Sequence, residues 1–519
     1  MTRIVSRWSS CLPLIALAAF MPLAAQADVR LPAVISDHMV LQQEIAVPIW
    51  GWADKGEEVT VSIAGQSMSV KAGADGKWMI KLDKLTSGGP HELLITGKNT
   101  LKITDVLIGE VWLGSGQSNM AMTVSRSKDF EAEQAAANLP HIRMFRESSG
   151  SATDPQETGS GKWEVCSSES VGAFSATAFF FGREIHKSLK LPVGLINSSV
   201  GGTPIEAWTS LPAQKSLSEL KPLFARWENA TATYDPEKAK TQYDKAFAEW
   251  RTAAKKARDD GKQLPRPPQP PVNPRRNSHH PAVLFNGKIA PLVPYAIRGA
   301  IWYQGESNAN SSRDGSSPEN YGLQLRTLIA DWRGRWGQGD FPVAWVQLPL
   351  FQKPQVEPVE ETGWTIIREQ MLKTLKVPNT GMAITLDLGE ANDIHPRDKQ
   401  GVGKRLAQWA LAKVYNQKNV VASGPLPDGY EIDGEEVVLS FRYAAGLQAS
   451  GEELKGFAIA GADQKWYPAK ARIDGEEVVV WHPDVKQPKA VRYAWADNPD
   501  ANLINGAGLP ASPFRTDAK

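Results

Sequence analysis

The chain has 519 residues, with 58 Lys plus Arg against 57 Asp plus Glu, so its length predicts several domains and its balanced charge argues against nucleic-acid binding. Hydrophobic residues make up 42% and charged residues 22%, a composition typical of globular proteins that excludes general disorder. The 2 cysteines are Cys11 and Cys166. Because Cys11 lies in the leader described next, an intramolecular disulfide and a multi-cysteine zinc site are excluded, and Cys166 is expected to be an ordinary buried thiol.

Residues 1–27 have the pattern of a secretory signal peptide. Arg3 and Arg7 precede an apolar run that ends in Ala25-Gln26-Ala27, a small-residue cleavage pattern. The run is too short and too interrupted by proline for a membrane span, and no later segment offers about 18 consecutive apolar residues. We expect cleavage after Ala27 and a soluble, secreted or periplasmic protein without membrane attachment. An uncleaved N-terminal anchor is the alternative.

Three regions follow the leader. Over 28–105, short alternating segments such as Val47–Trp52, Val59–Ile63 and Trp78–Leu82, separated by Gly-rich turns, predict an N-terminal β-sandwich domain. Over 106–418, strand-like runs alternate with amphipathic stretches such as Ala178–Leu189 and Val402–Val414, which predicts an α/β core with a mainly parallel sheet.

Two further segments complete the organisation. A charged, helix-periodic run followed by a Pro-rich stretch indicates an insertion at about 211–281 within the α/β core. Over 419–519, the heptapeptide IDGEEVV occurs at 432–438 and again at 473–479, and Asp-Gly ahead of a β-branched run is a hairpin signal. We therefore predict two hairpins within one C-terminal β-domain.

A candidate nucleophile follows the strand-like run Val106–Leu113. The run leads into the sequence GSGQSNM at 114–120. A serine at a strand end can be lifted clear of the sheet to meet a base; Gly116 permits the tight turn before Ser118, and the amides that follow can face a developing oxyanion. A turn serine with a structural task is the alternative at this stage.

A candidate base lies near the other end of the core, in the sequence DLGEANDIHP at 387–396. His395 is one of 8 histidines and stands among carboxylates. A neutral imidazole suits a general base near physiological pH, and a carboxylate is needed to fix its tautomer. Asp393, two residues earlier, leaves the same face of an extended segment and is the natural orienting group. Glu390 and Asp387 are the fallback candidates.

The order of these motifs resembles the SGNH hydrolases and, within them, the sialate O-acetylesterase family of carbohydrate esterases. The resemblance covers residues 28 to about 414 and rests on GQSNM at 116–120, GGTPIEAW at 201–208, NGKIAPL at 286–292, WYQGESN at 302–308 and DIHP at 393–396. It implies a three-layer α/β/α core with a mainly parallel sheet, flanked here by the N- and C-terminal β-domains. It also implies a serine esterase that removes O-acetyl groups from sugars.

The resemblance also implies site residues. Ser118 matches the nucleophile and His395 the base, while the oxyanion hole receives the amides of Ser118 and of Gly201 or Gly202, with Gly202 preferred, and the side chain of Gln304. The general pattern places the acid at position 392, which is Asn here, so Asp393 is taken as the acid and a Ser-His dyad stays open. The candidates for substrate binding are Asn119, Glu306, Trp208 and Trp302. Core packing is the alternative for both tryptophans, and a hydrogen bond that holds its own loop is the alternative for Glu306.

The expected partner is an acetylated carbohydrate, either an O-acetylated sialic acid or a plant hemicellulose such as xyloglucan or xylan, and the oligomeric state stays open. No metal or other cofactor is expected, because a serine esterase needs none and the adjacent His279 and His280 have no carboxylate companions. Two other functions remain possible: a non-catalytic carbohydrate-binding surface protein, and a glycosidase that uses Glu306 with Asp393 or Glu390.

Overall fold

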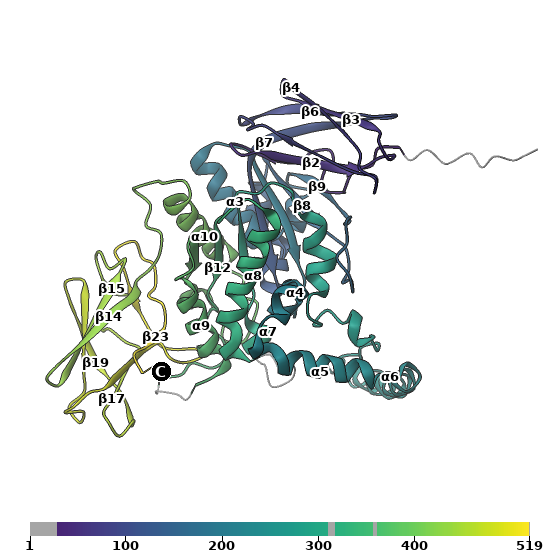
Figure 1. Cartoon of the computed structure of the whole chain (residues 1–519). Helices are drawn as coiled ribbons and strands as arrows, with labels where there is room; N and C mark the ends of the chain where they lie inside the picture. Colours follow the sequence, from purple (N-terminus) through teal and green to yellow (C-terminus); the bar gives the residue numbers. More distant parts are fainter. Residues whose placement is uncertain (1–27, 310–316, 357–360, 518–519) are drawn as a thin grey trace, which may run out of the picture.

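The computed structural model describes residues 28–309, 317–356 and 361–517, so the predicted signal peptide lies outside the described residues. Within these ranges no helix combines the length and the apolar character that a membrane crossing requires. Two small β-domains, at the purple and yellow ends of the chain, flank a central α/β domain (Figure 1).

The N-terminal domain contains all three strands predicted from the sequence. One pair of strands, β2 (Val47–Trp52) and β5 (Lys77–Leu82), is antiparallel. The other sheet joins β3 (Glu58–Ile63), β4 (Gln66–Lys71), β6 (Gly88–Thr96) and the first part of β7 (Thr100–Gly116). The domain boundary predicted at 105/106 falls inside β7, which runs on from this sheet into the central one.

The second half of β7 lies in the middle of the central sheet, whose order is β13-β12-β11-β7-β10-β8-β9. All neighbouring pairs from β13 to β8 are parallel, and only the edge pair β8–β9 is antiparallel. The strands are β8 (Leu139–Glu147), β9 (Gly161–Cys166), β10 (Val193–Ser199), β11 (Gly299–Tyr303), β12 (Val343–Val346) and β13 (Thr380–Ala383). The mainly parallel sheet predicted from the sequence is confirmed.

Helices cover both faces of this sheet, which confirms the three-layer α/β/α arrangement (Figure 1). Alternate residues of β7 enter different cores: Trp112 packs with α3 (Ala176–Leu189) and α10 (Lys399–Lys413), and Leu113 packs on the opposite face. That second face is covered by α8 (Tyr321–Trp336) and α9 (Gly363–Thr374). The short helices are α1 (Ser118–Ala121), α2 (Phe130–Ala135) and α7 (Glu306–Ala309).

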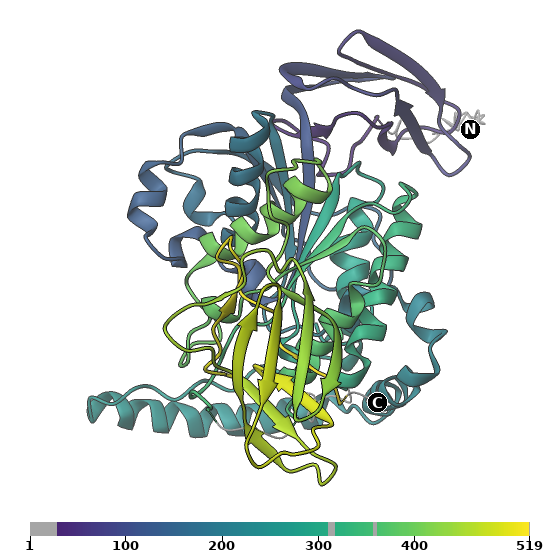
Figure 2. The ribbon, with the colours of Figure 1, turned by 90° about the vertical axis from the view of Figure 1, so that its left-hand side faces the viewer.

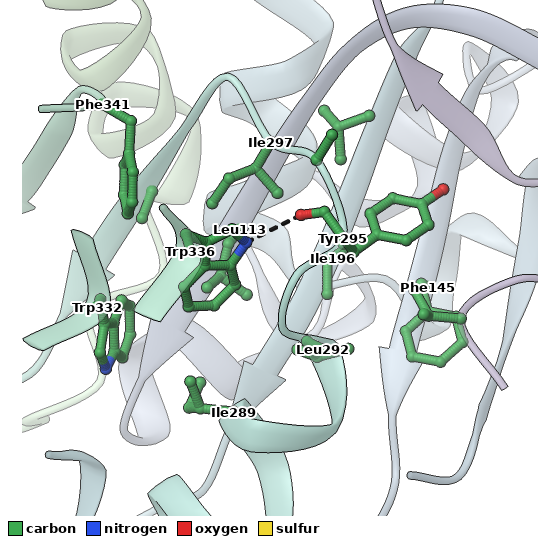
Figure 3. Close-up of a cluster of buried hydrophobic side chains, with 14 of the residues drawn as sticks. Leu113, Phe145, Ile196, Ile289, Leu292, Tyr295, Ile297, Trp332, Trp336 and Phe341 are labelled. Carbon is green, nitrogen blue, oxygen red and sulfur yellow. Dashed lines mark hydrogen bonds between the residues drawn. The ribbon is translucent and has the colours of Figure 1, made fainter. Parts of the chain in front are cut away.

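The core on the α8 side is rich in aromatic rings (Figure 3). Tyr295 connects the N-terminal region to helix α8. Its hydroxyl donates to the carbonyl of Val40 at 2.7 Å, and its backbone carbonyl accepts from Trp336 Nε1 at 2.9 Å. Val40 belongs to β1 (Val40–Gln42), which pairs in parallel with β7. On another edge, Cys166 at the end of β9 is 1% exposed, and burial raises the pKa of its thiol to about 12, as expected of a structural cysteine.

The predicted insertion contains α4 (Leu211–Lys215), α5 (Lys221–Ala232) and the long α6 (Pro236–Asp259), and its Pro-rich stretch has no regular secondary structure. Figure 2 shows α6 reaching sideways beyond the core.

Both predicted C-terminal hairpins are present, as β14 (Leu426–Asp433) with β15 (Glu436–Arg442), and β19 (Lys470–Asp474) with β20 (Glu477–Trp481). Strands β15 and β20 pair, so the two hairpins form one sheet. The remaining strands are β16 (Gln448–Ala449), β17 (Phe457–Ala460), β18 (Trp466–Pro468), β21 (Ala490–Tyr493), β22 (Leu503–Ile504) and β23 (Phe514–Arg515).

The C-terminal domain packs against the loops that leave the carboxyl ends of β12 and β13, because Leu350 and Leu386 join its apolar core. Arg368 of α9 is fully buried and holds this junction. Its guanidinium donates to the carbonyl of Pro349 at 2.6 Å and to the carbonyl of Ala496, in the C-terminal domain, at 2.7 Å.

Candidate active site

Ser118 stands at the carboxyl end of β7, where the strand turns into α1. The turn depends on Gly116, whose φ is 139°, a conformation that side chains other than glycine rarely adopt. A Cβ at Gly116 would lie 2.1 Å from the carbonyl oxygen of Tyr303, on the neighbouring strand β11. The same oxygen accepts the amide of Gln117 at 2.9 Å, so this turn is fixed to the sheet.

His395 lies in the loop that precedes α10, and its Nε2 atom is 2.8 Å from the Oγ atom of Ser118, across 277 residues of sequence. Its side chain is 31% exposed. Burial lowers the pKa of His395 below its usual 6.5; the Asp393 carboxylate opposes this change, and the positive charges of Lys399 and Arg126 add to it. A neutral imidazole in contact with a serine hydroxyl can accept the hydroxyl proton at physiological pH.

Asp393 reaches His395 in two ways. Its Oδ1 atom accepts the His395 backbone amide at 2.8 Å and lies 3.5 Å from Nδ1 of the ring, while its side chain is 52% exposed. The fallback carboxylates bond elsewhere: Glu390 accepts the amide of Arg397 at 2.7 Å, and Asp387 pairs with Arg405. Among the predicted acids, Asp393 is therefore the one that the fold places at the imidazole.

The loop that follows β10 contacts Ser118. A Cβ at Gly201 would lie 3.4 Å from the Cβ of Ser118, so the loop after β10 contacts the serine directly. Gly202, next in the chain, has a φ of 72° and is exposed. Within the described residues, the amides of Ser118 and Gly202 donate to no protein acceptor. Both are therefore available to a negatively charged oxygen.

Gln304 has a task other than the predicted one. Its side chain is fully buried, and Nε2 lies within hydrogen-bond distance of three acceptors: Asn308 Oδ1 at 2.7 Å, and Gln117 Oε1 and the Thr203 carbonyl at 3.2 Å each. Its Oε1 atom accepts from the Tyr321 hydroxyl at 3.0 Å. An amide has two hydrogens, so none is left for an oxyanion. Gln304 instead connects the loops after β7, β10 and β11.

Two of the predicted substrate-binding residues are buried behind the serine. Asn119 is 0% exposed and Glu306 is 2% exposed, and Asn119 Nδ2 donates to Glu306 Oε1 at 2.5 Å. Burial raises the pKa of the Glu306 carboxyl. Hydrogen bonds to the carboxylate, among them the one from Asn119, oppose this increase. A side chain enclosed in this way does not reach a sugar, which corrects the substrate-binding prediction for both residues and removes the basis for a glycosidase that uses Glu306.

The two tryptophans of the motifs are core residues. Trp208 is 0% and Trp302 is 1% exposed, and their rings meet edge to face at 6.1 Å. Trp208 Nε1 donates to Thr203 Oγ1 at 3.0 Å, and Trp302 Nε1 to the Tyr321 hydroxyl at 3.3 Å. The prediction of sugar contacts is wrong for both, because an aromatic face with neighbours on each side has no surface left for a ligand.

Comparison with known proteins places this arrangement in a family. A family model described as "Carbohydrate esterase, sialic acid-specific acetylesterase" matches residues 108–256 and 285–412, more than half of the chain. The chain belongs to this family. The matched residues include both Ser118 and His395, and most of the unmatched gap between the two ranges is the insertion.

Relatives of this carbohydrate acetylesterase match over almost its whole length. Sialate O-acetylesterase of Rattus norvegicus is 31% identical, covering 93% of this chain and 94% of the relative, and that of Homo sapiens is 32% identical, with 93% and 92% covered. A solved structure described as a novel carbohydrate acetylesterase from Xanthomonas citri is 34% identical, has a TM-score of 0.78, and is covered in full by 95% of this chain. The chain is thus a carboxylic ester hydrolase, which sets aside the non-catalytic interpretation.

Sequence reasoning about this carbohydrate acetylesterase missed Lys399, the first residue of α10. Its side chain is fully buried, and Nζ donates to Asn119 Oδ1 at 2.7 Å and to the Pro396 carbonyl at 2.8 Å. Burial lowers the pKa of Lys399 to about 7, although Glu306 and other carboxylates oppose this. Its position just after the DIHP segment could have indicated that it lies near the active site. Nothing in the sequence PRDK at 396–399 indicates that this lysine is buried.

Proposed function

We propose that this carbohydrate acetylesterase hydrolyses O-acetyl groups from sugars through an acetyl-serine intermediate. Ser118 is the nucleophile, His395 the general base, Asp393 the group that orients His395, and the amides of Ser118 and Gly202 the oxyanion hole. The observation that carries the proposal is the 2.8 Å contact between His395 Nε2 and Ser118 Oγ.

The reaction takes two steps. Ser118 Oγ attacks the acetyl carbonyl carbon while Nε2 of His395 takes the hydroxyl proton, and the oxyanion is held by the two free amides. The bond from the carbonyl carbon to the sugar oxygen then breaks, and His395 gives its proton to that oxygen. Water, deprotonated by His395, attacks the acetyl-serine and releases acetate, and the proton returns to Ser118.

An O-acetylated sialic acid is the first substrate to test, because the mammalian relatives are named sialate O-acetylesterases. A sialic acid carries a carboxylate, for which arginine is the usual partner. Arg126 suits this task, since it is exposed and its charge acts on His395. An acetylated hemicellulose oligosaccharide is the second substrate, because an acetyl-transfer site of this kind does not by itself select the sugar.

The test is acetate release by the wild-type protein and by Ser118→Ala from both substrates side by side. We expect release by the wild type, a fall of at least about 1,000-fold in the variant, and a wild-type serine that becomes heavier by one acetyl group in quenched mass spectra. Release by the variant at the wild-type rate would overturn the nucleophile assignment. Release of acetate from the hemicellulose substrate alone would identify plant polysaccharides, and not sialic acids, as the substrate class.

We further propose that the protein is exported and that cleavage follows Ala27. The support is the small-residue pattern Ala25-Gln26-Ala27 after the apolar run. Mass spectrometry of the mature N-terminus in the periplasmic and extracellular fractions tests this, with Asp28 as the expected first residue. An intact Met1 on protein that fractionates with the membrane would favour the uncleaved anchor.

A further inference from the structure

Behind Ser118 and His395 lies a buried chain of three polar side chains, Lys399, Asn119 and Glu306, here called the clamp. Lys399 Nζ donates to Asn119 Oδ1 at 2.7 Å, and Asn119 Nδ2 donates to Glu306 Oε1 at 2.5 Å. Exposure of the three residues is 0%, 0% and 2%. They come from three elements, since Lys399 begins α10, Asn119 follows the serine in α1, and Glu306 begins α7 after β11.

The clamp holds the backbone on both sides of His395. Asn119 Nδ2 donates to the carbonyl of Ile394 at 3.0 Å, and Lys399 Nζ donates to the carbonyl of Pro396 at 2.8 Å. Asn119 is also the residue directly after Ser118, so one amide group fixes the serine helix and the histidine loop to each other. Removing either donor frees a carbonyl next to the base.

Such a clamp matters because Asp393, the group that orients the ring of His395, contacts the ring only at long range. Its Nδ1 atom lies 3.5 Å from the half-exposed carboxylate of Asp393, a longer separation than that of a normal hydrogen bond. The position of Nε2 relative to Ser118 therefore depends on how firmly the loop itself is held. A misplacement of about 1 Å between reacting groups lowers the rate by about 100-fold.

The charges of the clamp also act on the base. The positive charge of Lys399 is among the causes that lower the pKa of His395, together with burial and Arg126, and Asp393 opposes them. Glu306 in turn opposes the effect of burial on the pKa of Lys399 and so favours its charged form. The other groups that face Lys399 are Glu390, Asp393, Asp398 and the ring of Tyr303, whose centroid is 5.2 Å from Nζ.

We propose that Lys399, Asn119 and Glu306 are positioning residues of the esterase, which fix the His395 loop against Ser118 and keep the imidazole in its neutral form. The inference rests on the proposed function, because it gives the clamp its effect through His395. It predicts that loss of the clamp lowers turnover rather than substrate affinity and moves the acid limb of the pH profile.

The first experiment compares Lys399→Met with Arg333→Met. Arg333 is the matched control, since it is also a buried cation that donates to backbone carbonyls, those of Phe341 and Pro378. These carbonyls precede β12 and β13, at the amino ends of the strands, whereas the active site lies at the carboxyl ends. For Lys399→Met we expect kcat to fall about 10- to 100-fold with KM within about twofold, and the acid limb to move to higher pH. Arg333→Met should lower the melting temperature without changing the limb.

The second experiment separates geometry from charge. Glu306→Gln keeps an oxygen that accepts from Asn119 but removes the charge that sustains the proton on Lys399, so we expect kcat within about threefold of wild type and an acid limb at higher pH. Glu306→Ala removes the acceptor as well, and kcat should fall by about tenfold or more. Melting curves identify any variant that is unfolded at the assay temperature.

Three results would overturn the inference: an unmoved acid limb in both Lys399→Met and Glu306→Gln, equal kcat values for Glu306→Gln and Glu306→Ala, or the same kinetic change in Arg333→Met. Ser118→Ala, run beside them, keeps the two proposals apart. If Ser118→Ala is inactive and the clamp variants behave as wild type, only the clamp fails. If Ser118→Ala is active, the proposed mechanism fails first.

Discussion

Replacing Gly116 by alanine tests how tightly the turn that precedes Ser118 is constrained. The new Cβ would lie 2.1 Å from the Tyr303 carbonyl oxygen, whereas real Cβ contacts stay beyond 3.0 Å, so the turn or strand β11 must shift by about 1 Å. The φ of 139° adds about 1–3 kcal/mol of backbone strain. Moving Tyr303 away would weaken its 2.9 Å bond from the Gln117 amide.

Because Ser118 follows two residues later, a shift of this size displaces Oγ from His395. We expect kcat/KM for acetate release to fall about 100-fold, which corresponds to about 2.7 kcal/mol of transition-state stabilisation. Gly114→Ala is the matched control on the same strand, since its Cβ would lie 3.3 Å from Met120 Sδ and 3.4 Å from the Cβ of Ala178, both side-chain atoms. We expect activity within about fivefold of wild type. Activity of Gly116→Ala above one third of the wild-type value would refute the reasoning.

Two further predictions concern His395 and Trp302. Burial lowers the pKa of His395, and the neutral form is the base, so kcat/KM should rise with pH to a plateau with its midpoint below 6.5; a profile flat from about pH 5 to 8 under conditions where chemistry limits would contradict the assignment of the base. Trp302→Ala should lower the free energy of unfolding by about 3–5 kcal/mol, seen as a lower denaturation midpoint, with KM unchanged in the folded protein. A higher KM at an unchanged midpoint would mean that the ring contacts the sugar.

The features that sequence reasoning anticipated are those whose chemistry is local. A glycine-preceded serine after a strand and a histidine among carboxylates carry their signals within a few neighbouring residues, and a parallel sheet brings the carboxyl ends of its strands to one edge. The two Asp-Gly hairpins were predictable for the same reason. That their strands β15 and β20 pair with each other is a contact between distant segments, and no local pattern encodes it.

The direction in which a side chain points was not predictable. The motifs supplied Gln304, Glu306 and Trp302 as residue types suited to a ligand. Strand β11 and the segment that follows it turn all three inward, where Glu306 accepts from Asn119 and Gln304 donates to Asn308. Lys399 was missed for the opposite reason, because lysine is almost never fully buried unless it is paired. Its partner Asn119 lies 280 residues away in the sequence, so this contact becomes visible only when α10 is placed against α1.

The N-terminal domain is continuous with the central domain, and is not joined to it by a linker, because strand β7 belongs to both sheets. Its 17 residues pass without a break from one sheet to the other, and β1 pairs with residues 107–109 of the same strand. The turn that carries Ser118 thus directly follows a strand whose first residues belong to the N-terminal domain. A protein shortened to begin at Val106 would lose residues 100–105 of β7 and the whole of β1, so removal of the N-terminal domain is expected to destabilise the strand that carries Ser118.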